Sequence, residues 1–388
     1  MTSNGSWQKV KFDEICKNIS DRIDDPKQAK TDYYVGLEHL DSEDPKISRH
    51  GSPQDVSKTK LLFKPGHILF GKRNWYLRRL AVAQREGICS AHMLVLEPIE
   101  GKSTKEFLPL LMFGDDFYEK ALMVSAGSMS PTIKWKDLAP LEFLIPSIEQ
   151  QENILSLTHK IDQTISNSQN LLEKTKNYMI SRRELLLTRG IGHTKFKKVK
   201  WLYGKTIEIP EEWEVRKISD CNVEITTGSR NTQDKILNGK YPFYVRSQKI
   251  ERINTFSFDK EAVITAGDGV GTGKVFHYIN GKFDLHQRAY SISNFNKKLN
   301  GKFFYYYFQK NFFTRAMMMN SIASVDSIRM DTIAGMKILV PPLPEQQQIT
   351  SILSNINEQI TQQQSHLTNL KVLRKSILNS KLTKEKYN

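Results

Sequence analysis

The sequence predicts an α+β protein in which two mixed α/β modules are separated by two long antiparallel helices. Three observations predict this fold. The chain carries an internal repeat at a constant offset, a proline-led phrase occurs in both copies, and a long stretch without proline or glycine follows each phrase. Because the chain has 388 residues, each module is long enough to bury a core of its own.

The internal repeat rests on residues that match without a gap. Pro146 and Pro341 lie 195 residues apart, and the same offset aligns a long stretch on both sides of them. The matched pairs include Phe113 with Phe308, Phe117 with Phe312, Ile133 with Ile328, Leu144 with Leu339, Gln151 with Gln346, Ile154 with Ile349 and Leu172 with Leu367. Towards the front of each half the match is looser. A register that holds across a proline boundary indicates a duplicated unit, so we expect an internal pseudo-twofold repeat.

The back portion of each half has the pattern of a long helix. The phrases LIPSIEQQENI (residues 144–154) and VPPLPEQQQI (residues 340–349) place proline where a helix starts, the one place where a helix tolerates it. Apolar residues then recur at spacings of three and four. We expect helices over residues 146–189 and 341–388, each roughly 60 Å long. A narrow apolar stripe favours a coiled coil, with each helix paired to its own repeat.

The front portion of each half is rich in β-strand signals. Residues 1–145 and 213–340 contain short runs such as HILFG (residues 67–71) and AVITAG (residues 262–267), bounded by Gly, Pro and Asn. These runs predict the two mixed modules. Between the halves, residues 190–212 are basic and are best interpreted as a linker.

The composition favours a polyanionic partner. The net charge is +15 and the isoelectric point is near 9.4, which suits nucleic acid before a membrane surface. No run approaches the ~18 apolar residues of a membrane span, and the polar start lacks the apolar core of a signal peptide, so we expect a soluble, cytoplasmic protein. The three cysteines are far apart and without zinc-ligand spacing, so neither a disulfide nor a structural metal is expected.

In the first module, the stretch GKRNWYLRRLAV (residues 71–82) follows a predicted strand. Its cationic side chains suit phosphates or guanine, its amide suits adenine, and its aromatic residues suit props against bases. The candidate nucleic-acid contacts are Lys72, Arg73, Asn74, Tyr76, Arg78 and Arg79, together with Ser128 of a later loop of small residues. For any one of them, the alternative is solvated charge or an ordinary turn on the surface.

In the second module, the candidates come from three places in the sequence. They are Arg246, Ser247 and Lys249 after the run YPFYV, then Gly271, Thr272 and Lys274, and finally Gln287 and Arg288. The stretch AGDGVGTGKVF (residues 266–276) fails as a phosphate-binding loop, because Asp268 and Val275 stand where such a loop needs glycine and a hydroxyl residue. We interpret it as a glycine-rich turn that lets backbone approach a nucleic acid closely.

The first helical turns carry a cluster of amide and acidic residues. These are Gln150, Gln151, Glu345, Gln346 and Gln347. Such side chains commonly satisfy free N–H groups at a helix start, and that capping role is one interpretation. Contact with a partner subunit is the other.

Together these features resemble the specificity subunit of a type I restriction-modification system. The resemblance covers nearly the whole chain. It rests on the phrases PLPEQQQI (residues 342–349), PSIEQQENI (residues 146–154), LLLTRGIGHTKFKK (residues 185–198) and IPEEWEV (residues 209–215). The first module looks like one common class of recognition domain, whereas GTGKV (residues 271–275) and HQRAYSI (residues 286–292) resemble a different class.

The resemblance implies a non-catalytic DNA-recognition subunit. Two target recognition domains, residues 1–145 and 213–340, would each read one half of a bipartite duplex target. The helices would set the spacer and dock methyltransferase subunits, two for each chain, and a restriction subunit would join them. S-adenosylmethionine, ATP and Mg would be bound by those partners, and no cofactor is expected in this chain.

Two other functions remain open at this point. One is a self-sufficient DNA methyltransferase or nuclease, although the sequence contains no FxGxG-like methyl-donor loop and no NPPF or DPPY phrase. The other is a coiled-coil scaffold that binds nucleic acid, which the basic charge would also serve.

Overall fold

The computed structural model describes residues 7–127, 129–201, 205–269, 271–319 and 327–382, which form two compact units. Unit 1 comprises residues 1–169 and 365–388, and unit 2 comprises residues 170–364. The boundary residues Gln169 and Gln364 are 195 positions apart and are therefore equivalent in the repeat. Each unit thus contains one β-rich module and a part of each long helix.

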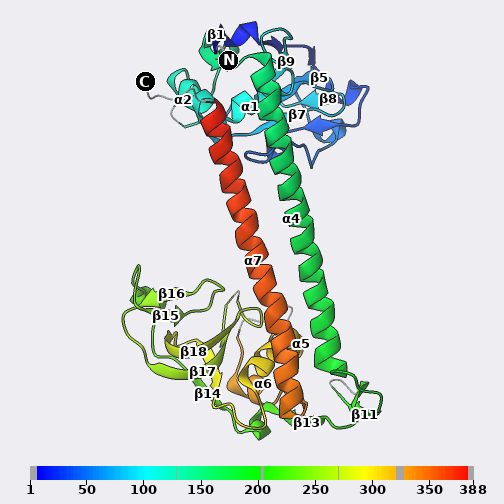
Figure 1. Cartoon of the computed structure of the whole chain (residues 1–388), viewed down its shortest axis with the longest axis vertical. Coiled ribbons are helices and arrows are strands. Elements are labelled where there is room, and N and C mark those ends of the chain that lie inside the picture. Colours follow the sequence, from blue (N-terminus) through cyan, green and yellow to red (C-terminus); the bar gives the residue numbers. More distant parts are fainter. Residues whose placement is uncertain (1–6, 128, 202–204, 270, 320–326, 383–388) are drawn as a thin grey trace, which may run out of the picture. The chain divides into compact units, whose positions relative to one another are not determined.

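Unit 1 combines two small sheets with short helices (Figure 1). Its strands are β1 (Gln8–Lys11), β2 (Cys16–Ile19), β3 (Arg22–Ile23), β4 (Tyr34–Val35), β5 (Lys60–Phe63), β6 (Ile68–Gly71), β7 (Leu80–Val82), β8 (Gly87–Cys89), β9 (Met93–Pro98) and β10 (Glu142–Ile145). Its α-helices are α1 (Phe107–Phe113), α2 (Asp115–Met123) and α3 (Trp135–Leu138), and its 3-10 helices are η1 (Phe12–Glu14), η2 (Pro26–Gln28), η3 (Leu37–His39), η4 (Pro53–Asp55) and η5 (Trp75–Leu77). The sheets have the orders β2-β9-β6-β7 and β3-β5-β8-β4, and β1 pairs separately with β10.

Unit 2 is built around one larger sheet. Its strands are β11 (Phe196–Lys200), β12 (Thr206–Pro210), β13 (Glu214–Lys217), β14 (Glu224–Thr227), β15 (Tyr241–Tyr244), β16 (Glu251–Ile253), β17 (Phe258–Ala266), β18 (Phe276–Leu285), β19 (Ala289–Ser293) and β20 (Lys337–Val340). Its helices are α5 (Gly301–Met319), α6 (Met330–Ala334), η7 (Ile218–Cys221) and η8 (Thr232–Asp234). The main sheet has the order β14-β19-β17-β18-β15-β16, with β15 and β18 parallel and the other pairs antiparallel.

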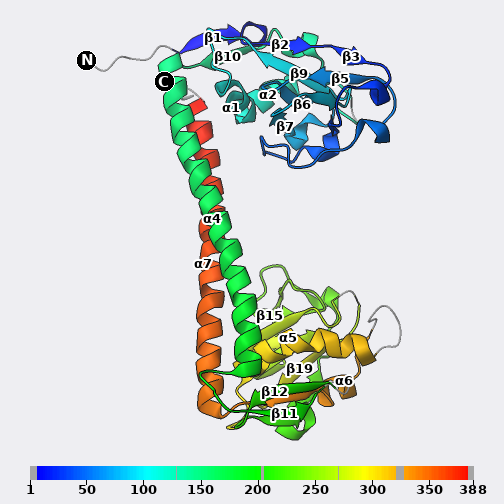
Figure 2. The ribbon, with the colours of Figure 1, turned by 90° about the vertical axis from the view of Figure 1, so that its right-hand side faces the viewer.

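Two long helices, α4 (Ile148–Arg189) and α7 (Leu343–Leu382), take part in both units. In unit 1 the first turns of α4 lie beside the last turns of α7, and Ile154 and Leu378 share a core there (Figures 1 and 2). In unit 2 the last turns of α4 lie beside the first turns of α7, where Leu187 and Ile349 share a core. The two helices are antiparallel in each unit. The predicted α+β class with two long helices is confirmed.

The sequence repeat is also seen in the secondary structure, but only in the back portion of each half. Adding 195 to the bounds of β10 gives those of β20, and the same shift carries α3 onto α6 and α4 onto α7 within a few residues. The shift also carries α1 and α2 onto the single helix α5, because the chain leaves helical geometry at Gly114. The sheets before these elements differ in strand number and order. A common frame therefore supports two different sheets.

The expected linker is partly folded. Within residues 190–212, β11 and β12 pair as an antiparallel hairpin. Val199 and Ile207 lie opposite each other in that hairpin and pack against the core of unit 2. Val199 lies between two lysines and Ile207 lies between Thr206 and Glu208, so apolar and polar residues alternate and one face of the segment packs on the core. This alternation is why the segment folds as a hairpin rather than as an extended linker.

The module of each unit is fixed to a helix end by a polar contact at equivalent repeat positions. In unit 1 the Asn379 amide donates a hydrogen bond to Asp115. In unit 2 the Lys310 ammonium lies 2.9 Å from Glu184. Asp115 is equivalent to Lys310, and Asn379 to Glu184. The two copies therefore make the same contact between module and helix, one through a hydrogen bond and the other through an ion pair. Within the described part of the chain, no helix is long and apolar enough to cross a membrane.

Candidate nucleic-acid interface

The glutamines of the proline-led phrases are buried clamps. The Gln346 amide nitrogen donates to the carbonyl oxygens of Lys298 and Pro341, both at 2.8 Å, and its oxygen accepts from the Asn300 N–H at 2.8 Å. The side chain has 0% exposure. It ties the start of α7 to the loop before α5, so its amide is fully used inside the unit.

Gln151 repeats this clamp in unit 1. Its amide nitrogen donates to the carbonyl oxygens of Lys102 and Pro146, and its oxygen accepts from the Thr104 N–H, each at 2.9 Å. It is also fully buried. Neither Gln151 nor Gln346 can therefore reach a partner without unfolding of the helix start. The predicted capping role does not describe these two residues, because their side-chain oxygens accept from the Thr104 and Asn300 N–H groups of distant loops and not from N–H groups of the helix start.

Glu345 has an internal role as well. Its carboxylate accepts from the Ile191 N–H at 3.0 Å and from Trp213 Nε1 at 2.8 Å, and it lies 2.8 Å from His193 Nε2. These contacts join the start of α7 to the residues that follow α4. By contrast, Gln150 is half-buried and Gln347 is exposed, so these two are the predicted interface residues whose surface another chain can contact.

In unit 1, the predicted basic stretch is a loop that contains the 3-10 helix η5. Asn74 and Arg78 flank η5 and both adopt left-handed backbone geometry, with φ of 51°. Trp75 is buried, and its Nε1 donates to Ser125 Oγ at 2.8 Å. The loop is therefore held against the segment around residues 125–132, which carries the other predicted contact, Ser128. Ser128 itself lies outside the described residues.

The side chains of this loop differ in accessibility. Arg73 is exposed, with Nη2 3.4 Å from Ser130 Oγ, and Tyr76 is 54% exposed. Lys72, Asn74 and Arg79 are half-buried. Burial, followed by the charge of Arg22, lowers the pKa of Lys72. Arg73 and Tyr76 are thus the residues of this loop best exposed to a ligand.

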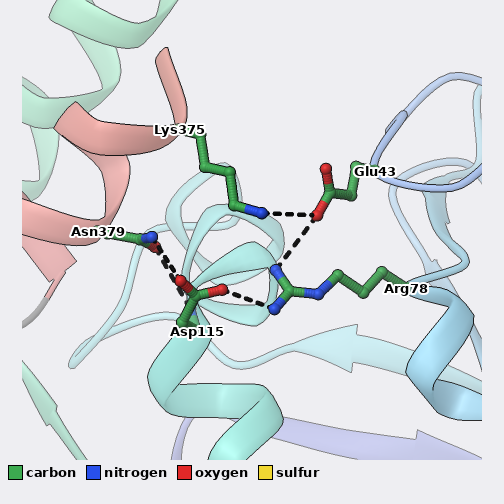
Figure 3. A network of polar contacts seen from close by, with 5 residues as sticks. All are labelled: Glu43, Arg78, Asp115, Lys375 and Asn379. Carbon is green, nitrogen blue, oxygen red and sulfur yellow. Dashed lines mark hydrogen bonds and ion pairs between the residues drawn. The ribbon is translucent and has the colours of Figure 1, made fainter. Parts of the chain in front are cut away.

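Arg78 points into unit 1, where it is the centre of a polar network (Figure 3). Its guanidinium donates to Glu43 at 3.2 Å and to Asp115 at 2.6 Å, and it lies over the ring of Tyr118. Lys375 of α7 also contacts Glu43. Burial opposes ionisation of Asp115, but the hydrogen bond and charge of Arg78, together with Lys375 and Asn379, outweigh it and lower the pKa of that carboxyl. Sequence position suggested a nucleic-acid contact for Arg78, whereas its contacts are those of an internal brace.

In unit 2, hydrogen bonds bring four segments together that are far apart in the sequence. The His286 N–H donates to the Tyr244 carbonyl at 2.9 Å, which joins the ends of β18 and β15. The Gly267 N–H donates to the Arg288 carbonyl at 2.9 Å, and the Gln287 N–H donates to the Arg230 carbonyl at 2.9 Å. The segments after β14, β15, β17 and β18 therefore form one loop cluster, which contains most of the predicted contacts of this module.

Asp268 lies at the centre of this cluster. Its carboxylate accepts from Arg246 Nη1 at 2.9 Å and from Arg288 Nη1 at 2.8 Å. Burial opposes ionisation of Asp268, but the hydrogen bonds and the charges of the two arginines together outweigh it and lower the pKa of the carboxyl. The side chain of Arg288 is 62% exposed and that of Arg246 is 39% exposed, against 18% for Asp268. The carboxylate thus lies beneath two accessible guanidinium groups.

The other predicted residues of unit 2 are either exposed on the surface or determine the shape of the loop. Gln287, Lys249, Ser247 and Lys274 are exposed, and Lys274 lies over the ring of Phe313. Thr272 is buried, and its hydroxyl donates to the Gly269 carbonyl at 2.6 Å. A Cβ on Gly271 would come within 2.3 Å of the Arg246 carbonyl oxygen, so only glycine fits there. Thr272 and Gly271 therefore shape the loop.

Sequence reasoning missed two residues of this cluster. In the sequence, Asp268 was noted only as the residue that does not fit a phosphate-binding loop. Asn231, whose Oδ1 accepts from the Gln287 amide at 2.6 Å, stands in no motif that points to a binding role. An acidic residue between two basic segments could have been suspected as their common partner. The pairing across 22 and 20 residues became visible only in the fold.

Comparison with known proteins points to one family. The model of the type I restriction modification DNA specificity domain matches residues 4–177 and 210–370, one range in each half. The type I restriction enzyme EcoDI specificity subunit of Escherichia coli is 25% identical over 179 residues, covering 46% of this chain and 38% of that protein. The MjaIX specificity subunit of Methanocaldococcus jannaschii is 22% identical over 280 residues, covering 66% of this chain and 63% of that protein.

The chain therefore spans less than two thirds of the length of these two relatives. A solved structure gives a fuller match. The crystal structure of the type I restriction-modification system S subunit from M. genitalium has a TM-score of 0.60 and 14% sequence identity, and the match covers 99% of this chain and 98% of that one. At that identity the likeness is one of fold.

Proposed function

The chain belongs to the type I restriction modification DNA specificity family, and from this premise we propose that it is the DNA sequence-recognition subunit of such a system. Each unit reads one half of a bipartite duplex target. The observation that carries this proposal is the division within the repeat: the frame from β10 to α4 recurs as β20 to α7, whereas the sheets that bear the basic loops differ. Two different reading surfaces on one frame suit two different half-sites.

The long helices support a role as spacer. α4 has 42 residues, and at about 1.5 Å per residue it is roughly 60 Å long. One turn of duplex DNA is about 34 Å, so a helix of this length exceeds one turn. A fixed, unread gap between the half-sites follows, with its length set by α4 and α7.

We further propose that the chain provides recognition and that its partners provide chemistry. Methyltransferase subunits, one at each proline-led phrase, would dock near Gln150 and Gln347, and a restriction subunit would complete the complex. S-adenosylmethionine would serve the methyltransferase subunits, and ATP and Mg the restriction subunit. This chain then needs no cofactor of its own.

The test is a methylation map of a strain that expresses this chain with its methyltransferase subunit and no other DNA methyltransferase. We expect one bipartite motif with a constant gap. Two results would contradict the proposal: methylation by the chain alone, with S-adenosylmethionine bound to it, or binding that is equally strong to every duplex and depends only on salt.

Two arginine variants distinguish an exposed DNA contact from an internal stabilising role in unit 1. Arg73→Gln removes an exposed charge, so affinity for duplex DNA is expected to fall about 3- to 10-fold at unchanged folding stability. Arg78→Gln leaves Glu43 and Asp115 without their guanidinium, and we expect a loss of about 1–2 kcal/mol in the free energy of unfolding. Urea unfolding and DNA titrations at two salt concentrations measure both effects.

The pH dependence checks the same network. Because the folded-state pKa of Asp115 is lowered, its stabilising contribution is present above the ordinary pKa of an aspartate and is lost as the pH falls through the folded value. Arg78→Gln should therefore lose more stability at pH 7 than at pH 3. If Arg78→Gln weakened DNA binding as much as Arg73→Gln without loss of stability, the brace role would be wrong.

A further inference from the structure

We propose that Asp268 sets Arg246 and Arg288 as a pair that reads guanine, so that the half-site recognised by unit 2 contains at least one G·C base pair. This inference rests on the proposed function and adds the identity of a base and the side chains that recognise it. Asp268 acts as a positioning residue, and the arginines make the contact.

The arrangement differs from an ordinary surface ion pair in its depth. In the triad of Asp268, Arg246 and Arg288, the carboxylate is the least exposed member and Arg288 the most exposed. In the Arg78 network of unit 1 the order is the reverse, because the Arg78 side chain is 22% exposed against 45% for Glu43 and 39% for Asp115. Here one half-buried acceptor holds two more exposed cations, and the net charge of the triad is positive, which favours the edge of a duplex.

The backbone around the triad fixes its position. Gly267 donates its N–H to the Arg288 carbonyl and accepts from the Ile328 N–H at 2.7 Å, so Asp268 follows a residue held on both sides. The next residue, Gly269, has φ of +75°, which glycine adopts freely. Gly271 brings its Cα against the Arg246 carbonyl. These contacts hold the backbones of Asp268, Arg246 and Arg288 together in one loop cluster.

Each arginine keeps the donors that guanine needs. Arg246 and Arg288 each use Nη1 on Asp268, and within the described residues Nε and Nη2 of both make no hydrogen bond. Guanine presents two acceptors, N7 and O6, to the major groove, and a guanidinium binds them with two parallel N–H groups. Adenine places a donor where guanine has O6, so it would be rejected. Because Asp268 already restricts the arginine rotamers, less conformational entropy is lost on binding.

The alternative for the same residues is contact with phosphates. An arginine on a phosphate strengthens binding to every sequence and adds to the salt dependence, whereas an arginine on a base affects one position of the target. The two roles therefore give different results with the same variants.

The experiment uses the full chain with its methyltransferase subunit, and binding to duplexes in which each base pair of the methylated motif is changed in turn. We expect Arg288→Gln to lower affinity for the native target about 10- to 100-fold and to abolish the preference for guanine at one position of one half-site. Arg288→Lys should not restore that preference, because an ammonium lacks the planar fork. Asp268→Asn should weaken the preference at the same position by about 3- to 10-fold.

A matched control comes from β13, where Arg216 is paired with Glu214 on the surface of the same unit. Arg216→Gln should leave every base preference unchanged. The inference is overturned if the half-site of unit 2 contains no G·C pair, or if Arg288→Gln weakens binding to all duplexes equally and lowers the salt dependence. If the unmodified complex has no base preference at all, the proposed function itself fails and the arginine role with it.

Discussion

Replacing Gln346 with leucine is expected to lower the free energy of unfolding of unit 2 by about 3–5 kcal/mol. The substitution removes three hydrogen bonds from a side chain with 0% exposure. The Pro341 carbonyl oxygen would be left buried without a partner, and the Lys298 carbonyl and the Asn300 N–H would lose their partner at part-buried positions. A buried group left without a partner costs about 1–3 kcal/mol. The start of α7 should then separate from the loop before α5.

The repeat supplies both a second test and a control for this prediction. Gln151→Leu should destabilise unit 1 by a similar amount, because Gln151 makes the equivalent three hydrogen bonds. Gln347→Leu changes an exposed neighbour and should alter the stability by less than about 0.5 kcal/mol. Hydrogen exchange by mass spectrometry assigns each loss to a unit. Equal exchange in the Gln346 and Gln347 variants would show that the clamp contributes little.

Adding seven residues to both long helices is expected to change the gap between the half-sites and to leave each half-site unchanged. The insertions belong after Gln169 and after Gln364, the equivalent unit boundaries, because each then lies outside the cores of both modules. Seven residues lengthen a helix by about 10 Å, the rise of about three base pairs. A seven-residue insertion also keeps the apolar stripe in register along a coiled coil.

A methylation map of the strain with the lengthened chain measures the outcome. A single insertion, in α4 alone, is the control, because it breaks the match between the two helices and should abolish specific methylation. If the chain with both insertions kept the original gap, the helices would not set the spacing, and the gap would have to come from the modules or from partner subunits.

The parts of the fold that follow from local sequence could be predicted. Proline at a helix start and apolar spacings of three and four act over a few residues, so the long helices were visible, and a constant offset exposed the repeat. The different sheets could not be predicted, since strand order depends on contacts between distant segments. The β11–β12 hairpin was missed because the lysines on both sides of Val199 made the segment look like a basic linker, although apolar and polar residues alternate there.

The sequence could identify which residues are able to bind nucleic acid, but not which of them are accessible for binding and which stabilise the fold. Arg73 and Arg78 are equally basic in the sequence, yet only Arg78 has two carboxylates at hydrogen-bond distance. Those carboxylates, Glu43 and Asp115, are 35 and 37 residues away. The same limit applies to Gln346, whose partners outside its own helix start are 46 and 48 residues away. A charge or an amide shows what a residue can bind, whereas the fold decides whether it is free to do so.

The most direct test of the central claim, that each unit reads one half of the target, is a methylation map after exchange of residues 213–340 for the corresponding module of a relative that recognises a different sequence. We predict that one half-site changes to that of the relative, while the other half-site and the gap stay as they were. A motif in which both halves changed together, or in which neither changed, would contradict the account.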